Sequence, residues 1–581
     1  MEKWSISMIN PLHKAGSKMD PDNYRGISLV SCFSKYFSAI LNIRLTQYAL
    51  DNDIFSKSQL GFLAGCRTAD ALFMLGNLIE FYCKNNNRYM YGCFVDFKKA
   101  FDSVPRPVLF QKLLTHGING KFYDCLVNIY SNDVACIKTG DSLTPSFLAN
   151  QGVKQGCILS PTLFNIFLSD FQHLIETDEC DPVKLSDVTK LGCLIWADDI
   201  LLLSKSKEGL QNMLNALNIF AKENGMTLNI KKTKIMIFNK TGRHLSRNFY
   251  FGSEKLNTTR QYKYLGFLVT PSGEINSGLK DLKDRALRAF SKLKNKMGIT
   301  FRNQPSITIK IFRSIVEPIL LYASDWWGVM KHPTSNPIET LFMSFCKQLL
   351  GVQKQTTNNG VLLELGCVPL MILAQKKAVK NWLRIASGGN CNPLVIESYQ
   401  IALSHNLSWP KNIETLISEI GLRQSFLDID SDIHEQVYQR KKDIFHQKTF
   451  VDIKKDDSKL RAYGKIKIEP GFEKYLDDIK CVKVRTAITK LRLSNHALMI
   501  EKGRHLNIDK NLRFCPFCPG IIEDEQHFIT RCPQYRHLRT ELLKDAKVFI
   551  PSIFNRSDDR WLTIIYLMSK IIPTSYNEKL V

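Results

Sequence analysis

Residues 194–203 read Leu-Ile-Trp-Ala-Asp-Asp-Ile-Leu-Leu-Leu, and the fold is organised around this stretch. Apolar residues flank two adjacent aspartates, Asp198 and Asp199, which predicts two short strands joined by a tight turn that begins at Ala197. A carboxylate in an apolar setting is costly unless its charge is compensated, and a divalent cation is the usual compensation. This stretch alone also allows a plain hairpin whose aspartates face water.

Two earlier stretches favour the metal-binding alternative. Residues 94–102 read F-V-D-F-K-K-A-F-D, with Asp96 at the end of an apolar strand, and residues 155–161 read Q-G-C-I-L-S-P. Together with the A-D-D at 197–199, and in this order, they resemble the reverse transcriptases of non-LTR (LINE-type) retrotransposons. Three blocks in the right order are far more specific than any one of them.

This resemblance implies an α+β fold of the right-hand polymerase type, with fingers, palm and thumb. A mainly helical C-terminal region and a small zinc knuckle would follow the polymerase. We expect fingers and palm over 1–270, a helical thumb and post-thumb region over 271–390, a helical basic connector over 391–500, a zinc knuckle over 501–545 and a C-terminal tail over 546–581.

The resemblance also implies the reaction, which is RNA-directed DNA polymerisation. A DNA primer 3′-hydroxyl would attack the α-phosphate of an incoming deoxynucleotide (dNTP) opposite an RNA template. Two Mg²⁺ ions would be held by Asp96 and Asp198, with Asp199 as the flanking carboxylate that contacts the metal less directly. Lys232 would neutralise or protonate the departing pyrophosphate.

Candidate substrate contacts follow from the same resemblance. Phe101 stands where the family keeps a bulky ring under the sugar, which would exclude a 2′-hydroxyl; the alternative is an ordinary core phenylalanine. Two further stretches resemble the family's fingers blocks, the first at residues 23–29 and the second at residues 59–70. Arginines in these blocks are candidates for contact with the triphosphate or the template backbone, although each taken singly is equally well explained as a solvated loop residue. The remaining candidates are Arg25, Arg67, the Phe97 backbone carbonyl as a metal ligand, and Gln155 and Gly156 beside the nascent base pair.

The chain departs from the family pattern at several positions. Gly26 replaces the proline of the first fingers block, and Trp196 replaces the usual tyrosine before A-D-D. In the second fingers block Leu63 and Cys66 replace two basic residues, and Arg67 lies one place later. The phosphate contacts of that block therefore do not carry over residue for residue.

Two helices near the catalytic blocks bear on function. Asp102 or Ser103 is expected to cap a helix that begins near Pro105 or Pro107, so Asp102 is interpreted as a cap and not as a metal ligand. Residues 279–297 place apolar side chains at helical spacing with lysines and arginines between them, which predicts a thumb helix that follows a duplex backbone. The alternative for this helix is a solvated surface helix.

Four potential metal ligands lie near the C-terminus, namely Cys515, Cys518, His527 and Cys532. Two thiols separated by two residues, followed by a histidine and a third thiol, are typical of a closed tetrahedral zinc site. Such a site holds together a module too small to have its own core. The pattern also resembles the knuckle that ends many LINE-type polymerases, so we expect one structural Zn²⁺; the alternative is four reduced, unligated side chains.

The composition limits which binding partners and which cellular compartment are expected. The chain has 79 Lys and Arg against 55 Asp and Glu, a net charge of +24, which suits polyanions such as an RNA template and a DNA primer or target. A membrane surface is the other candidate, but no run approaches a membrane span. Residues 1–6 are no secretory signal, so the 16 cysteines are expected to be reduced in an intracellular setting, in the nucleus and cytoplasm.

Two other interpretations remain open at this point. One is a related polymerase such as an intron-encoded maturase. The other is an inactive or domesticated nucleic-acid-binding relic, which the loss of any of the three aspartates would have favoured. No endonuclease block precedes Ile9, so we expect either that the nick is made elsewhere or that this chain is part of a longer protein.

Overall fold

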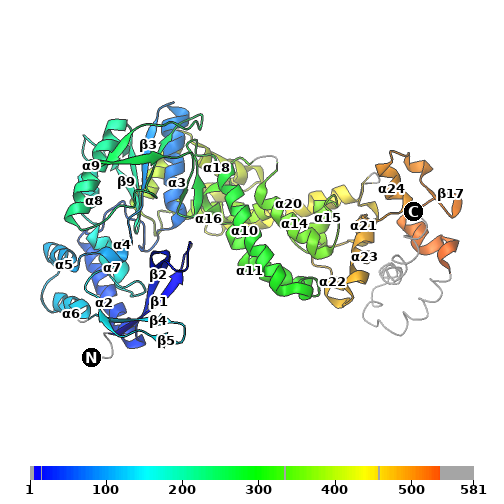
Figure 1. Cartoon of the computed structure of the whole chain (residues 1–581). Coiled ribbons are helices and arrows are strands. Elements are labelled where there is room, and N and C mark those ends of the chain that lie inside the picture. The colour runs from blue at the N-terminus through cyan, green and yellow to red at the C-terminus, as the bar shows by residue number, and fades with distance from the viewer. Residues whose placement is uncertain (1–5, 15, 132, 333–334, 456–457, 537–581) are drawn as a thin grey trace. The chain divides into compact units, whose positions relative to one another are not determined.

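The computed structural model describes residues 6–536 except for residues 15, 132, 333–334 and 456–457. The expected tail over 546–581 and the last part of the expected zinc knuckle, from 537, lie outside the described residues. The chain forms two compact units, whose elements are labelled in Figure 1. The first unit runs to Gly278 and adds Asp325–Met330 and Lys380–Leu416; the second comprises Leu279–Ser324, Lys331–Val379 and the residues from Ile417 onward.

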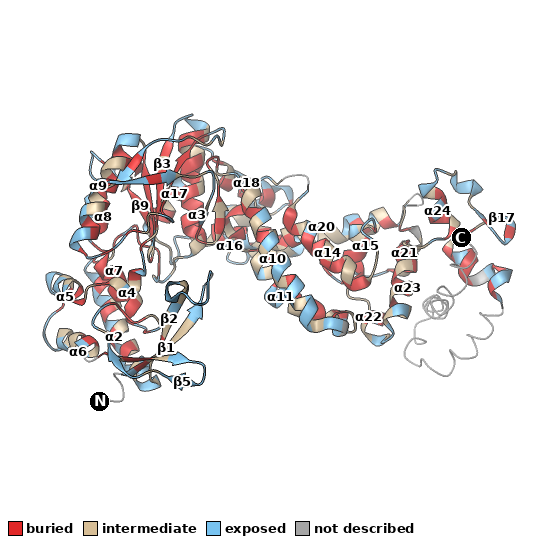
Figure 2. Cartoon of the chain, in the orientation of Figure 1, coloured by how far each residue is buried: buried red, intermediate tan, exposed pale blue. Residues whose placement is uncertain are grey.

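A six-stranded sheet is the centre of the first unit. Its strand order is β12-β13-β11-β3-β10-β9. The bounds are β3 (Met90–Val95), β9 (Cys193–Trp196), β10 (Asp199–Ser204), β11 (Lys234–Phe238), β12 (Phe249–Phe251) and β13 (Glu254–Thr258). Strands β3 and β9 are apolar runs that are buried along almost their whole length, as their red segments in Figure 2 show. This mixed sheet, covered by helices, confirms the predicted α+β class.

Helix α9 (Lys207–Glu223) covers one face of this sheet. The Ser206 side chain caps it by accepting a hydrogen bond from the Gly209 N–H. Its apolar residues recur every three to four positions and are buried against β3, β10 and β12. The largest of them are Leu210, Met213, Leu214, Leu217 and Phe220.

A second sheet carries the first fingers block on its strand β2. Its strands are β1 (Ile6–His13), β2 (Tyr24–Leu29), β4 (Val134–Thr139), β5 (Ser142–Leu143) and β6 (Phe147–Leu148). The order is β2-β1-β4-β5, and β6 also pairs with β4. The Ser28 N–H donates to the Gln155 carbonyl at 2.7 Å, so the Q-G loop is attached directly to the strand that carries Arg25.

The helix-cap prediction for Asp102 and Ser103 is wrong. These residues end a separate one-turn helix, α4 (Ala100–Ser103), and α5 (Arg106–Thr115) has Pro105 at its N-cap position without a side-chain cap. Asp102 and Ser103 belong to α4, so neither occupies the N-cap position of α5. Ser103 instead donates back to the Ala100 carbonyl, and Asp102 accepts a hydrogen bond from the Gln155 amide at 3.1 Å.

Residues 380–416 complete the first unit by packing on α3 (Thr68–Leu78), mainly through α17 (Pro393–Ser404). Asp70, which is fully buried, forms an ion pair with Arg384. The Trp409 indole donates to the Trp326 carbonyl at 2.9 Å. A segment more than 300 residues later in the chain therefore supports the helix that follows the second fingers block.

The second unit is built almost entirely of helices. They include α10 (Asn276–Met297), α11 (Pro305–Ile315), α14 (Pro337–Leu350), α15 (Asn358–Glu364), α20 (Ile433–Ile453), α23 (Val482–Arg492) and α24 (Met499–His505). The predicted helix over 279–297 is present as most of α10, and a cluster of aromatic rings anchors it. Its Phe290 contacts Phe301, Phe312 and Phe345 with ring centroids 5.7–6.1 Å apart. None of the described helices has the length and apolar character that crossing a membrane requires.

A buried ion network links α15 to α23 within this unit. Arg492 donates to Glu364 at 2.7 Å and to Glu473 at 3.0 Å, and Tyr475 donates to Glu364 at 2.5 Å. Glu364 is 0% exposed and Arg492 is 1% exposed. A charge this deep is tolerated only while its partners remain, because water cannot replace them.

Glu364→Gln is therefore expected to lower the free energy of unfolding of the second unit by about 3–5 kcal/mol. The variant keeps the side-chain shape but leaves the Arg492 guanidinium without its main counter-charge. Urea unfolding read by hydrogen exchange of the α15 and α23 amides measures the effect. Glu435→Gln is the control, because its carboxylate is 55% exposed and its ion pair with Lys376 should contribute less than about 1 kcal/mol. Equal losses in both variants would contradict the prediction.

Candidate active site and metal cluster

The central hairpin has the predicted form. Strands β9 and β10 pair with Trp196 opposite Asp199, and Ala197 turns the chain with a φ of +58°. In the pairing of β10 with β3, Ile200 lies opposite Val95. The next step of this antiparallel register places Asp199 level with Asp96, on the same side of the sheet. Residues separated by about 100 positions are thus brought to one edge of the sheet.

The pKa values of Asp198 and Asp199 are both raised. Partial burial, followed by the charges of Asp198 and Asp96, raises the pKa of Asp199 to about 6, even though its side chain reaches the surface. Burial is also the main cause of the raised pKa of Asp198, and the charge of Asp96 adds to it. These carboxylates are hard oxygen donors in a partly desolvated site, the donor set that suits Mg²⁺.

Three cationic side chains lie within electrostatic reach of these carboxylates. Lys232 Nζ is 3.9 Å from an Asp96 carboxylate oxygen. Burial lowers the pKa of Lys14, as do the charges of Arg25 and Lys232, while Asp198 acts in the opposite direction. The charge of Arg25 partly opposes the rise in the pKa values of Asp198 and Asp199. Arg25 and Lys232 therefore lie within electrostatic reach of the aspartates.

The sequence analysis missed Lys14 as a site residue. Lys14 directly follows β1, and the Lys14 N–H donates to the Asn23 carbonyl at 2.8 Å just before β2 begins. The β1–β2 pairing places Leu12 opposite Arg25, so both cations come from one end of a hairpin. The signal that could have revealed Lys14 was this hairpin, with a basic residue on each side of its loop.

Arg67 occupies a different environment from the other predicted cations. It lies at the N-cap of α3, where its backbone N–H donates to Asp70 at 2.9 Å. Its charge acts on Asp70 and Cys391. Among the described residues, no hydrogen bond or ion pair joins Arg67 to the three aspartates.

Phe101 is half-buried on the short helix α4, which follows β3 after a turn. Its ring stacks on Phe164 with centroids 4.4 Å apart and meets Phe62 edge-on at 6.2 Å. Phe62 is 56% exposed and has a φ of +63°, a strained conformation for a bulky residue. Phe62 is a second aromatic side chain beside Phe101 that the sequence analysis did not single out.

Phe97 directly follows Asp96, and the Q-G loop lies close to β2 of the second sheet. The Phe97 side chain is buried in the core, and its backbone pairs with Leu228 just after Asp96. The Gln155 amide donates to Asp102. Gly156 has a φ of +114°, and a Cβ there would lie 2.7 Å from the Ser28 carbonyl oxygen. Only glycine permits this close approach of the loop to β2.

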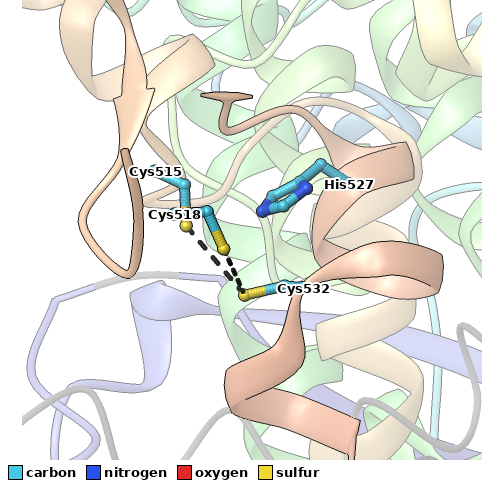
Figure 3. A group of neighbouring side chains, drawn as sticks. All are labelled: Cys515, Cys518, His527 and Cys532. Atoms are coloured by element: carbon cyan, nitrogen blue, oxygen red, sulfur yellow. Dashed lines mark hydrogen bonds between the residues drawn. The ribbon is translucent and has the colours of Figure 1, made fainter. Parts of the chain in front are cut away.

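A separate metal-type cluster forms in the second unit, where Figure 3 shows three cysteines and a histidine converging. Two of the cysteines lie on the hairpin of β16 (Phe514–Cys515) and β17 (Cys518–Ile522), while η5 (His527–Arg531) carries the histidine and precedes the third cysteine. The members are Cys515, Cys518, His527 and Cys532. All four are buried, and their ligand atoms lie within 4.8 Å of one another. Within the described part of the chain, no other group of His, Cys, Asp or Glu converges this closely.

The sulfur separations are compatible with zinc. The sulfur of Cys532 is 4.0 Å from that of Cys515 and 3.8 Å from that of Cys518. Two sulfurs that bind the same tetrahedral zinc, each at about 2.3 Å, are about 3.8 Å apart. The backbone N–H of His527 donates to the Asp524 carboxylate at 2.6 Å, which fixes the start of η5.

Comparison with known proteins agrees with the family that the catalytic blocks resemble. The family described as reverse transcriptase (RNA-dependent DNA polymerase) matches residues 12–269. A probable RNA-directed DNA polymerase from transposon BS of Drosophila melanogaster is 26% identical over 352 residues, which cover 58% of this chain and 38% of that protein. A Pol polyprotein from the type-1 retrotransposable element R2 of Popillia japonica is 30% identical over 242 residues, covering 40% of this chain and 38% of that protein.

Among solved structures, telomerase from Candida Tropicalis aligns with a TM-score of 0.35 and 13% identity over 69% of this chain and 64% of that chain. This score is too low to establish a shared fold. The chain spans only 38% of the length of the two curated relatives above. The family match and these relatives nevertheless confirm the predicted resemblance: residues 12–269 match the reverse transcriptase family, and this chain is similar to RNA-directed DNA polymerases of non-LTR retrotransposons.

Proposed function

We propose that this chain is the RNA-directed DNA polymerase of a non-LTR retrotransposon, which extends a DNA 3′ end on an RNA template. The observation that carries the proposal is the strand register that gathers Asp96, Asp198 and Asp199 beside Lys14, Arg25 and Lys232. Adjacent negative and positive groups match a reaction in which a metal-bound triphosphate is attacked by a hydroxyl.

Asp96 and Asp198 are the residues proposed to hold Mg²⁺, with Asp199 at the flank. Two bound ions would lower the pKa of the primer hydroxyl and stabilise charge on the pyrophosphate leaving group. The chain's own cations share the second task, because Lys14 and Arg25 add positive charge where the triphosphate is negative.

Lys232, 3.9 Å from Asp96, is proposed to neutralise or protonate the pyrophosphate as it leaves. Phe101 closes the sugar side of the site, and Gln155 lies beside the nascent base pair. Arg67 and the Phe97 carbonyl remain proposed contacts for phosphate and metal. Each of these residues acts by positioning or by charge.

The proposed partners are an RNA template, a DNA primer or target and dNTPs. The net charge of +24 and the alternating basic residues of α10 suit phosphate backbones. The Cys₃His cluster is proposed to hold one structural Zn²⁺. Because the target DNA is nuclear, we propose a nuclear as well as a cytoplasmic location.

A primer-extension assay tests the proposal. A labelled DNA primer annealed to an RNA template is incubated with the chain, dNTPs and Mg²⁺, and extension by successive nucleotides is the expected result. A binding measurement on the same duplex runs in parallel. Tight binding with no extension in either Mg²⁺ or Mn²⁺ would overturn the proposal in favour of a non-catalytic relic.

Phe101→Val is expected to admit ribonucleotides, lowering the preference for dNTPs over rNTPs on the order of 10- to 100-fold. The smaller side chain leaves room for a 2′-hydroxyl where the ring now stacks on Phe164. Single-nucleotide incorporation with each nucleotide type measures the preference. Phe110→Val is the matched control, because Phe110 also packs half-buried against the core but neighbours Tyr123 and Tyr130. An unaltered preference in Phe101→Val would make Phe101 an ordinary core residue.

A further inference from the structure

We propose that Gln59 is a positioning residue for the catalytic turn: its buried carboxamide holds the Ala197 backbone and so sets the direction of Asp198 and Asp199. Gln59 lies in the second fingers block, about 140 residues before the turn, and neither the catalytic nor the substrate-contact assignments include it. The inference rests on the proposed polymerase function.

The segment that contains Gln59 is attached to the outer edge of the hairpin. The Ile195 N–H donates to the Ser58 carbonyl at 2.9 Å, and the Leu60 N–H donates to the Ile195 carbonyl at 2.8 Å. These two bonds form a parallel bridge between Gln59 and Ile195. The edge of β9 is therefore covered, and the covering segment ends directly at the turn.

The side chain of Gln59 reaches the turn itself. It is 1% exposed, and its carbonyl oxygen Oε1 accepts the Ala197 N–H at 3.2 Å and the Gly61 N–H at 2.7 Å. Ala197 is buried and has the left-handed φ of +58°. A non-glycine residue keeps this conformation only when its surroundings hold it, and Oε1 is the acceptor that holds its N–H.

Gly61 shows how closely the two segments fit. A Cβ at this position would lie 2.4 Å from the Ala197 nitrogen and 3.0 Å from the Trp196 carbonyl carbon. From the other side, the Asn165 amide on α7 (Ser160–Phe167) donates to the Gly61 carbonyl at 3.0 Å. The strap formed by residues 58–61 is thus clamped between α7 and the aspartate turn.

This arrangement has a catalytic consequence. Asp198 directly follows the residue that Gln59 holds, so a shift of the Ala197 peptide is transmitted to both aspartates. A misplacement of about 1 Å in a reacting group can cost on the order of 100-fold in rate. Gln59 touches neither substrate nor metal in this proposal and acts only through the turn.

Gln59→Met tests the contact, because methionine has similar length and volume but no hydrogen-bond acceptor of comparable strength. We expect kcat for extension to fall on the order of 100-fold, the KM for dNTP to stay within about 3-fold, and the Mg²⁺ concentration for half-maximal rate to rise. A loss of general stability alone would not shift the Mg²⁺ requirement of the folded fraction.

Gln172→Met is the matched control, because Gln172 lies on α8 (Phe171–Ile175) and contacts the same strap. Gln172 Oε1 accepts the Ser56 hydroxyl at 2.5 Å and the Ser58 N–H at 3.2 Å, so it supports the segment with the same chemistry but away from the turn. We expect this variant to lose some thermal stability while kcat and the Mg²⁺ requirement stay within about 2-fold of wild type. Equal kinetic defects in both variants would show that Gln59 only supports the strap and has no specific effect on the turn.

Hydrogen exchange of the metal-free protein gives a readout that does not depend on activity. The exchange rate of the Ala197 amide should rise at least about 10-fold in Gln59→Met and stay unchanged in Gln172→Met, because only the first variant removes the acceptor of this amide. Unchanged exchange would overturn the inference. If wild type showed no extension but exchange responded as expected, the polymerase proposal would fail while the Gln59 contact stood.

Discussion

Asp198→Asn is expected to abolish nucleotide incorporation by the reverse transcriptase domain while leaving its fold intact. An amide has the shape of the carboxylate but lacks the charge that binds a hard divalent cation. Losing this ligand should lower the rate of a single incorporation on a preloaded primer–template at least about 1000-fold. Rapid-quench measurement with saturating dNTP and Mg²⁺ reports the chemical step directly.

The stability of this variant follows from the electrostatics of the site. Burial and the charge of Asp96 raise the pKa of Asp198, so its ionised form disfavours the metal-free folded state as pH rises above the unfolded value of about 4. An asparagine removes that cost, and the metal-free variant should melt no lower than wild type at pH 7. Asp170→Asn, which breaks a surface ion pair with Lys112, is the control for an ordinary aspartate. An incorporation rate in Asp198→Asn equal to that of wild type would contradict the proposed mechanism.

The catalytic hairpin could be predicted because its signals are local. Apolar runs on both sides of Asp198 and Asp199 specify two strands and a turn, and the chain supplies that turn at Ala197 as expected. The zinc-type cluster could also be predicted from local signals, since all four ligands fall within residues 515–532 and their spacing limits where they can meet.

Contacts between distant segments could not be predicted. The Arg384–Asp70 ion pair joins positions 314 residues apart, and no periodicity in either segment indicates the other. Gln59 similarly looks like any polar residue in a loop until the strap lies against β9. The error at Asp102 has the same origin: a local capping rule was applied where a contact with Gln155, 53 residues away, takes precedence.

The second large effect is expected at the Cys₃His cluster. Cys518→Ser should reduce bound zinc from one per chain to nearly none, as measured by elemental analysis of purified protein. Apparent binding free energies of about 10–16 kcal/mol for structural zinc exceed what so small a module can gain from its own core. Without the metal, the hairpin of β16 and β17 should lose its hydrogen-exchange protection.

The functional consequence separates binding from chemistry. The four ligands would leave no open coordination position, so the module is expected to strengthen binding of the RNA template or DNA target rather than to catalyse. Cys518→Ser should therefore weaken nucleic-acid affinity while single-nucleotide incorporation on a preloaded primer survives. Cys481→Ser, at an exposed cysteine outside the cluster, is the control and should retain zinc and affinity. Wild-type protein that contains no zinc after expression in zinc-supplied medium would refute the assignment.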